Sequence, residues 1–171
     1  LEKIKSSGTI VLGHRDSSIP FSYIADQPNQ PVGYAHDLQL KVVEAVKKEL
    51  NMPDLKVRYN LVTSQNRIPL ESNGTVDLEC GSTTNNAERR QKVAFTVPHF
   101  ITGARLLTKA SSSMDRLEDL QGKILASTQG TTPLKAVTQA NRERLMGIKI
   151  VEAPDHARGV EMVEKGEADA F

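Results

Sequence analysis

Short apolar segments alternate with helix-like segments along most of this chain. Residues Thr9 to Gly13 form a β-rich apolar run that predicts a buried strand, and the pattern from Gly33 to Leu50 predicts a helix. Further strands are expected at 56–62, 76–80, 103–108, 123–127 and 148–151, and further helices at 66–73, 88–92, 133–145 and 157–165. Strands that alternate with helices make a mostly parallel sheet with helices on both faces. The sequence therefore predicts an α/β fold.

The helix at residues 33–50 should present one apolar stripe to the sheet. That stripe is expected to consist of Leu38, Val42, Ala45, Val46 and Leu50.

The run Ala110-Ser111-Ser112-Ser113 is a low-complexity break after which the strand–helix pattern begins again. We therefore expect a first α/β lobe at residues 1–107 and the first part of a second lobe at residues 108–171. Two or three strands are thin for an independent core, and a new strand should begin near Asp169. We expect the second lobe to be incomplete, with further residues beyond Phe171.

A polar cluster follows nearly every predicted strand. These clusters lie at residues 14–18, 63–67, 82–89, 129–132 and 155–156. Ligands of open α/β sheets bind at the carboxyl ends of the strands, so the clusters should gather around one site.

Two of these clusters place an arginine among hydroxyl and amide side chains. One is Thr63 to Pro69, with Arg67, and the other is Cys80 to Arg89. A planar guanidinium with hydroxyl neighbours holds a carboxylate in a fixed orientation. Two such clusters, close in the fold, could hold two carboxylates, which indicates a small dicarboxylate ligand.

The composition argues against several other classes of function. Lys and Arg number 22 against 21 Asp and Glu, which gives a net charge of +1 and no basic face for nucleic acid. No apolar run approaches the ~18 residues of a membrane span. The single Cys80 gives no disulfide within the chain and no metal cluster, and nothing indicates a cofactor.

At longer motifs the chain resembles the bacterial extracytoplasmic solute-binding proteins for polar amino acids, and within them the glutamate/aspartate-binding group. The matching segments are Gly13 to Tyr23, Gly33-Tyr34 with Asp37, Thr63 to Pro69, Glu79 to Arg89, Arg105 to Lys109, Gly130 to Thr132 and Asp155-His156. The resemblance implies the two-lobed periplasmic-binding-protein fold of type II, whose lobes close over the ligand. In this chain the second lobe and the return to the first would be incomplete.

The resemblance also implies a ligand site made of eight residues. Arg89, Thr84 and Thr132 would hold the α-carboxylate of the ligand. The side-chain carboxylate would be held by Arg15, Ser64, Arg67 and His156. The Ser82 carbonyl and Thr84 would accept from the α-ammonium group. The family's acidic residue for that group, and a cysteine partner for Cys80, would lie beyond Phe171.

Several of these residues also have a purely structural interpretation. Ser82 and Thr84 could be turn residues that bond to their own backbone. Thr132 could be the N-cap of the helix that opens at Pro133, and could serve both roles. His156 could be a helix cap or a packed residue.

The function implied by the resemblance is that of a periplasmic binding protein, monomeric at full length. It would capture glutamate or aspartate and deliver it to the permease subunits of an ABC transporter, without catalysis. Two rivals remain open. One is a ligand-sensing receptor ectodomain, which a downstream transmembrane segment would favour. The other is a dehydratase on the same fold, which would need a general acid in the cleft.

Overall fold

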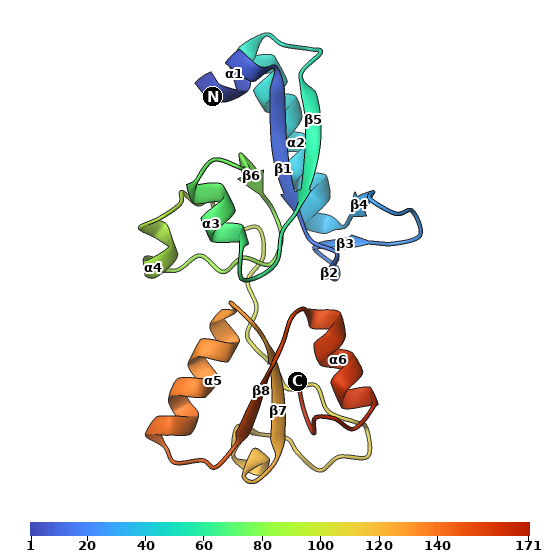
Figure 1. Ribbon diagram of the computed structural model, residues 1–171, viewed down its shortest axis with the longest axis vertical. Coiled ribbons are helices and arrows are strands. Elements are labelled where there is room, and N and C mark those ends of the chain that lie inside the picture. The colour runs from blue at the N-terminus through green and yellow to red at the C-terminus, as the bar shows by residue number, and fades with distance from the viewer. The chain divides into compact units, whose positions relative to one another are not determined.

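The computed structural model describes residues 1–171, which form two compact units, Leu1–His99 and Phe100–Phe171 (Figure 1). The sequence predicted the division after residue 107. Leu107 belongs with the second unit because its backbone exchanges two hydrogen bonds with that of Phe171, with N···O distances of 2.7 and 2.9 Å. The strand predicted at residues 103–108 is wrong, since only Thr108 takes part in an isolated bridge, with Ala170.

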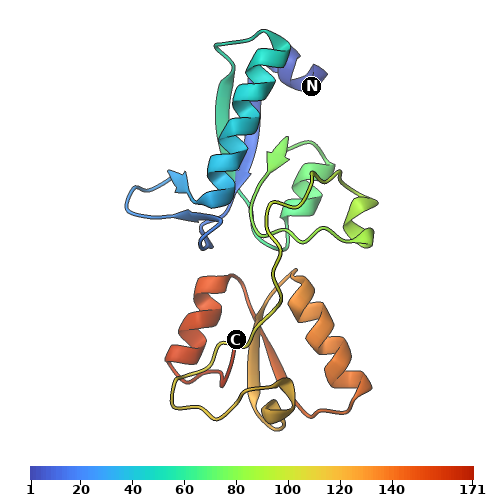
Figure 2. The ribbon, with the colours of Figure 1, turned by 180° about the vertical axis from the view of Figure 1, so that it is seen from behind.

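A three-stranded parallel sheet forms the centre of the first unit. Strand β1 (Thr9–His14) lies between β5 (Lys56–Leu61) and β6 (Leu78–Glu79). Helix α2 (Tyr34–Leu50) runs along one face of the β1–β5 pair (Figure 2). The shorter helices are α1 (Glu2–Ser7), α3 (Arg67–Ser72) and α4 (Ala87–Arg90).

Beside this sheet lies a small antiparallel sheet that the sequence analysis missed. It consists of β2 (Ser17–Ser18), β3 (Ser22–Ile24) and β4 (Pro31–Val32), in the order β2-β3-β4. Strands of two or three residues are too short to show a hydrophobic period, so the sequence pattern does not predict them.

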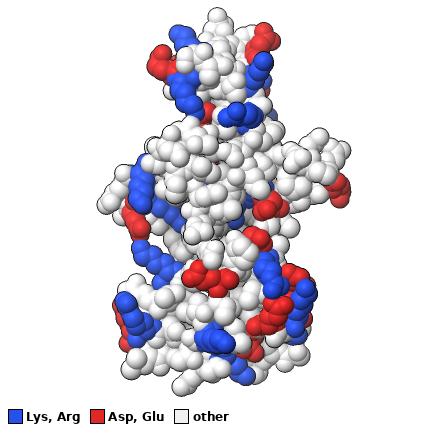
Figure 3. Space-filling view, in the orientation of Figure 1, with Lys and Arg blue, Asp and Glu red and all other residues white.

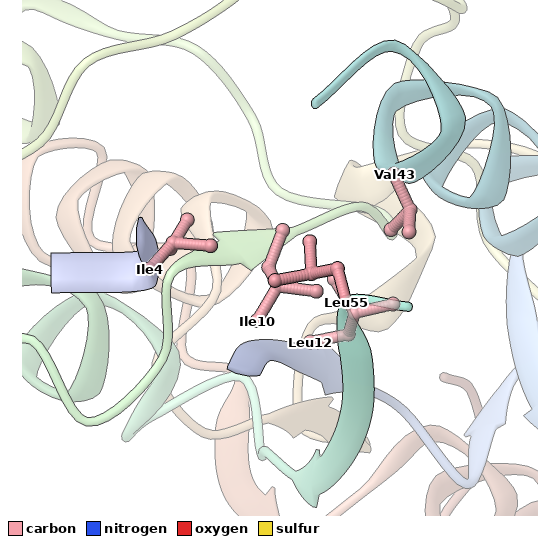
Figure 4. Packing of buried hydrophobic residues seen from close by; sticks show 5 residues of the cluster. All are labelled: Ile4, Ile10, Leu12, Val43 and Leu55. Carbon is pink, nitrogen blue, oxygen red and sulfur yellow. The ribbon is translucent and has the colours of Figure 1, made fainter. Parts of the chain in front are cut away.

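The core of the first unit lies between α2 and the sheet. Figure 4 shows its buried apolar side chains pointing toward one another: Ile4, Ile10, Leu12, Val43 and Leu55.

The apolar stripe predicted for α2 is confirmed only in part. Val46 and Leu50 pack against the core, whereas Val42 and Ala45 are exposed. The buried residues of α2 are Ala35, His36, Gln39 and Val43. Because Gln39 is polar, a hydrophobicity pattern does not predict that it is buried. Its amide nitrogen donates to the carbonyls of Gly13 and Leu78, at 3.1 and 2.8 Å, and so connects α2 to both β1 and β6.

The second unit is a parallel pair of strands between two helices (Figure 1). Strand β7 (Ile124–Thr128) pairs with β8 (Lys149–Ala153), and the helices are α5 (Thr132–Glu143) and α6 (His156–Glu164). A short 3₁₀ helix, η1 (Leu117–Leu120), precedes β7. The strand expected to begin near Asp169 is present as a parallel bridge from Ala170 to Leu125.

Charged side chains of both signs are interspersed on the surface. Lys and Arg lie among Asp and Glu over the face drawn in Figure 3. None of the helices is both long and apolar enough to cross a bilayer.

Candidate functional site

Three arginines follow the three parallel strands of the first unit. Arg15 comes directly after β1, Arg67 opens α3 after β5, and Arg89 lies in α4 after β6. Because parallel strands end at one edge of the sheet, side chains that follow them come together. The sheet therefore explains why arginines 52 and 22 positions apart in the sequence can meet.

Arg67 shows how close these charges are. Its side chain is buried, with 2% of the residue exposed. Burial and, to a smaller extent, the charges of Arg15 and Arg89 lower the pKa of its guanidinium to about 10, although the carboxylate of Glu79 opposes the change. Arg67 thus interacts with both other guanidinium groups, and with the carboxylates of Glu79 and, more weakly, Glu71. We call Arg15, Arg67 and Arg89 the arginine cluster.

Buried polar atoms without partners lie in this region. They include Nε and Nη1 of Arg67 and the hydroxyl of Ser64. A buried donor without an acceptor costs roughly 1–3 kcal/mol, so these atoms favour a ligand that brings acceptors. A carboxylate supplies acceptors and neutralises the guanidinium charge at the same time.

Arg15 is buried, and a hydrogen bond to its backbone fixes its position. Only 1% of the residue is exposed. Its N–H donates to the Ser22 hydroxyl on β3 at 3.0 Å, so the small antiparallel sheet fixes the position at which the Arg15 side chain begins. This role of β3 has no counterpart in the sequence analysis.

The loop after β6 fixes Arg89 through both its backbone and its side chain. The Asn86 side chain accepts from the Arg89 N–H at 2.9 Å and caps α4. The guanidinium donates to the Thr84 carbonyl at 2.9 Å. Earlier in the loop, Ser82 accepts a hydrogen bond from Ser18 at 2.8 Å between their hydroxyl oxygens. These contacts hold the loop at the edge of the sheet.

Thr132 and His156 belong to the second unit, at the carboxyl end of β7. The Thr128 hydroxyl lies 2.8 Å from Nδ1 of His156. The N-cap of α5 is Thr131, not Thr132: its hydroxyl accepts from the Leu134 N–H at 3.3 Å and donates to the Thr128 carbonyl at 2.7 Å. The expectation that Thr132 could be the cap is wrong, because the helix begins one residue earlier than predicted.

The predicted site residues therefore divide between the units. The first unit holds Arg15, Ser64, Arg67, Ser82, Thr84 and Arg89, and the second holds Thr132 and His156. In each unit they follow the carboxyl ends of parallel strands. Their roles toward a ligand stay a prediction.

Glu79 is a residue of this site to which the sequence analysis gave no role. It ends β6, and one oxygen of its carboxylate accepts from the Thr83 hydroxyl at 2.7 Å while the other, Oε1, is buried without a partner. The available signal was an acidic residue near the end of a predicted strand, shortly before the polar loop at residues 82–89.

Cys80 lies near the carboxylates of Glu79 and Glu71. Burial, with the charges of Glu79 and Glu71, raises the pKa of its thiol to about 12. The thiolate is the nucleophilic form of cysteine, so this environment disfavours nucleophilic chemistry.

The chain thus consists of two α/β units that carry cationic and hydroxyl side chains at the carboxyl ends of parallel strands. Residues 10–170 match the model of the bacterial extracellular solute-binding proteins, family 3. The chain belongs to this family.

Among its relatives are proteins named for acidic amino acids. The chain is 58% identical over its whole length to the L-glutamate/L-aspartate-binding protein of Pseudomonas aeruginosa, of which it covers 57%. It is 47% identical, again over its whole length, to the glutamate/aspartate import solute-binding protein of Escherichia coli, of which it covers 56%. The chain thus spans a little over half the length of these relatives.

Solved structures confirm the fold. The ancestral amino acid-binding protein AncCDT-1, a precursor of cyclohexadienyl dehydratase, matches 99% of this chain and 71% of its own, with a TM-score of 0.79 and 30% identity. The arginine-bound form of truncated ArgBP from T. maritima matches 99% and 75%, with a TM-score of 0.82 and 26% identity. The expected α/β fold of type II periplasmic binding proteins is therefore confirmed, and this chain corresponds to part of it.

Proposed function

We propose that this chain is part of a periplasmic solute-binding protein that captures glutamate or aspartate and delivers it to the permease of an ABC transporter. The observation that carries the proposal is the buried guanidinium of Arg67, whose Nε and Nη1 lack partners, within the arginine cluster. Such a group favours an ionised ligand. The names of the relatives with 58% and 47% identity support the same ligand class.

The eight site residues divide into two roles under this proposal. Arg89, Thr84 and Thr132 bind the α-carboxylate that every amino acid carries. Arg15, Ser64, Arg67 and His156 bind the side-chain carboxylate. The Ser82 carbonyl and Thr84 accept from the ammonium group.

The geometry favours binding over catalysis. The hydroxyls and backbone carbonyls beside the arginine cluster hold a ligand without taking a proton from it. The Glu79 carboxylate already accepts from the Thr83 hydroxyl and interacts with Arg67 and Arg89. The raised pKa of the Cys80 thiol disfavours a covalent step. We infer a binding protein that acts as a monomer.

Glutamine is the informative competitor, since a more distant relative, 26% identical, is named a glutamine-binding protein. Replacing the side-chain carboxylate by an amide leaves the buried guanidinium charge without a countercharge. A hydrogen bond to a charged group contributes roughly 1.5–3 kcal/mol against ~1 kcal/mol for a neutral one. With the uncompensated charge, we expect glutamate to bind at least about 100-fold more tightly than glutamine.

Isothermal titration calorimetry on the whole protein, stripped of endogenous ligand, tests this expectation. Arg67→Ala should mainly remove the preference for acidic ligands, whereas Arg89→Ala should remove binding of all amino acids. Arg90→Ala is the matched control, because Arg90 is exposed and its guanidinium donates only to Asn85 at 2.8 Å. Equal affinities for glutamine and glutamate would refute the proposed ligand class.

A further inference from the structure

The Glu79 side chain lies where two glycines leave room for it. Glu79 pairs with Gly13 across β6 and β1. A Cβ placed on Gly13 would lie 3.2 Å from Cβ of Glu79, and one on Gly81 would lie 2.5 Å from its Oε1. A side chain at either glycine would displace the carboxylate. The local sequence thus keeps space for an acidic group next to the arginine cluster.

The carboxylate is also fixed and desolvated. Oε2 accepts from the Thr83 hydroxyl at 2.7 Å, and Oε1 is buried without a hydrogen-bond partner. A buried carboxylate that lacks its full set of donors costs free energy unless nearby positive charge compensates for it. Here the compensating charges are those of Arg67 and Arg89, both of which interact with Glu79.

We propose that Glu79 is a built-in countercharge that sets the net charge of the ligand the site prefers. This inference rests on the proposed function. The arginine cluster carries three positive charges, and Glu79 cancels one of them. An amino-acid dicarboxylate such as glutamate carries a net charge of −1, whereas glutarate, the same skeleton without the ammonium group, carries −2. By offsetting one guanidinium, Glu79 lowers the gain from the extra charge of glutarate and so favours the amino acid.

The measurable quantity is the ratio of the affinities for glutarate and glutamate in the same variant. Comparing two ligands within one variant cancels general losses of binding. In Glu79→Gln the amide oxygen can still accept from Thr83, but the charge is gone. We expect the ratio to rise at least fivefold toward glutarate, which corresponds to ~1 kcal/mol.

Two variants at Thr83 separate charge from geometry. Thr83→Val removes the hydrogen bond to Glu79 and leaves the charge, so the ratio should stay within about twofold of the original. Thr83→Lys brings a cation to the carboxylate, so the ratio should rise as in Glu79→Gln. This second route to the same result keeps the inference testable if Glu79→Gln does not fold.

The titrations should be done at pH 8 on the whole protein. Glu71 interacts with Glu79, and burial, followed by the charge of Glu79, raises the pKa of Glu71 to about 7. At pH 8 Glu71 is mostly ionised in every variant, so its own protonation contributes little to the comparison.

The outcomes distinguish this inference from the proposed function. If the unmodified protein binds neither glutamate nor aspartate, the proposed function fails. If it binds glutamate but the ratio is unchanged in both Glu79→Gln and Thr83→Lys, the countercharge role is overturned. A shift in Thr83→Val as large as that in Glu79→Gln would also overturn it, because loop geometry would then explain the effect.

Discussion

Replacing Arg67 by methionine should make the ligand-free protein more stable while it loses its acidic ligand. The residue is 2% exposed, and two of its guanidinium nitrogens lack hydrogen-bond partners. Methionine has a similar length and no polar atoms. The substitution therefore removes a buried charge that, under the proposed function, binds the ligand and does not stabilise the fold.

The magnitude follows from the pKa of the guanidinium. Burial and the neighbouring arginines lower this pKa to about 10 in spite of Glu79. The difference from the ordinary pKa of arginine means that the folded protein destabilises the charged guanidinium by about 3 kcal/mol. Some of that gain is lost because methionine packs less well and leaves Glu79 with one fewer countercharge. We expect a net stabilisation of about 1–3 kcal/mol, or ~2–4 °C in Tm for each kcal/mol.

The assay is thermal unfolding of the whole protein after its endogenous ligand has been removed by unfolding, dialysis and refolding. Arg67→Met should unfold at a higher temperature than the parent without ligand, and added glutamate should raise the Tm of the parent alone. The exposed Arg90→Met should change neither value appreciably. A loss of more than about 1 kcal/mol in Arg67→Met would show that Arg67 stabilises the fold, and would refute the reasoning.

Three further predictions concern stability. Thr131→Ala should destabilise the protein by ~1–2 kcal/mol in chemical denaturation, because it removes the α5 cap and the hydrogen bond to the Thr128 carbonyl. Thr132→Ala should instead lower ligand affinity with little loss of stability, and equal losses of stability in the two variants would contradict this prediction. Gly33→Ala should lower the free energy of unfolding by more than ~2 kcal/mol, because φ is +124° and the new Cβ would lie 2.5 Å from the Phe21 carbonyl oxygen. Gly74→Ala is the control: φ is +78° but the space around it is open, so the free energy of unfolding should fall by less. Burial lowers the pKa of His36 below its value in the unfolded chain, so the unfolded state binds more protons and stability should fall as the pH drops through about 6.5. His36→Gln should reduce the dependence of the free energy of unfolding on pH between 7.5 and 5.5, and an unchanged dependence would exclude His36 as its source.

Much of the site was open to prediction from sequence because it depends on local pattern and on one rule of topology. The strands at Thr9, Lys56 and Ile124 and the helices after them follow from hydrophobic period and turn residues. Once the strands are parallel, the residues after them must share an edge. That is why the sequence alone places Arg15 and Arg67 at one edge of the sheet.

The tertiary structure decided what each position experiences. The sequence gives no sign that the polar Gln39 lies in the buried stripe of α2, because that depends on the carbonyls of Gly13 and Leu78 reaching it from two strands. Nor does it show that Glu79 lies between two glycines and beside the arginines. Local pattern fixes where a strand ends and which side chain follows it, whereas burial and charge depend on neighbours far away in the chain. For Arg67, those neighbours convert an ordinary arginine into a desolvated cation with unpartnered donors.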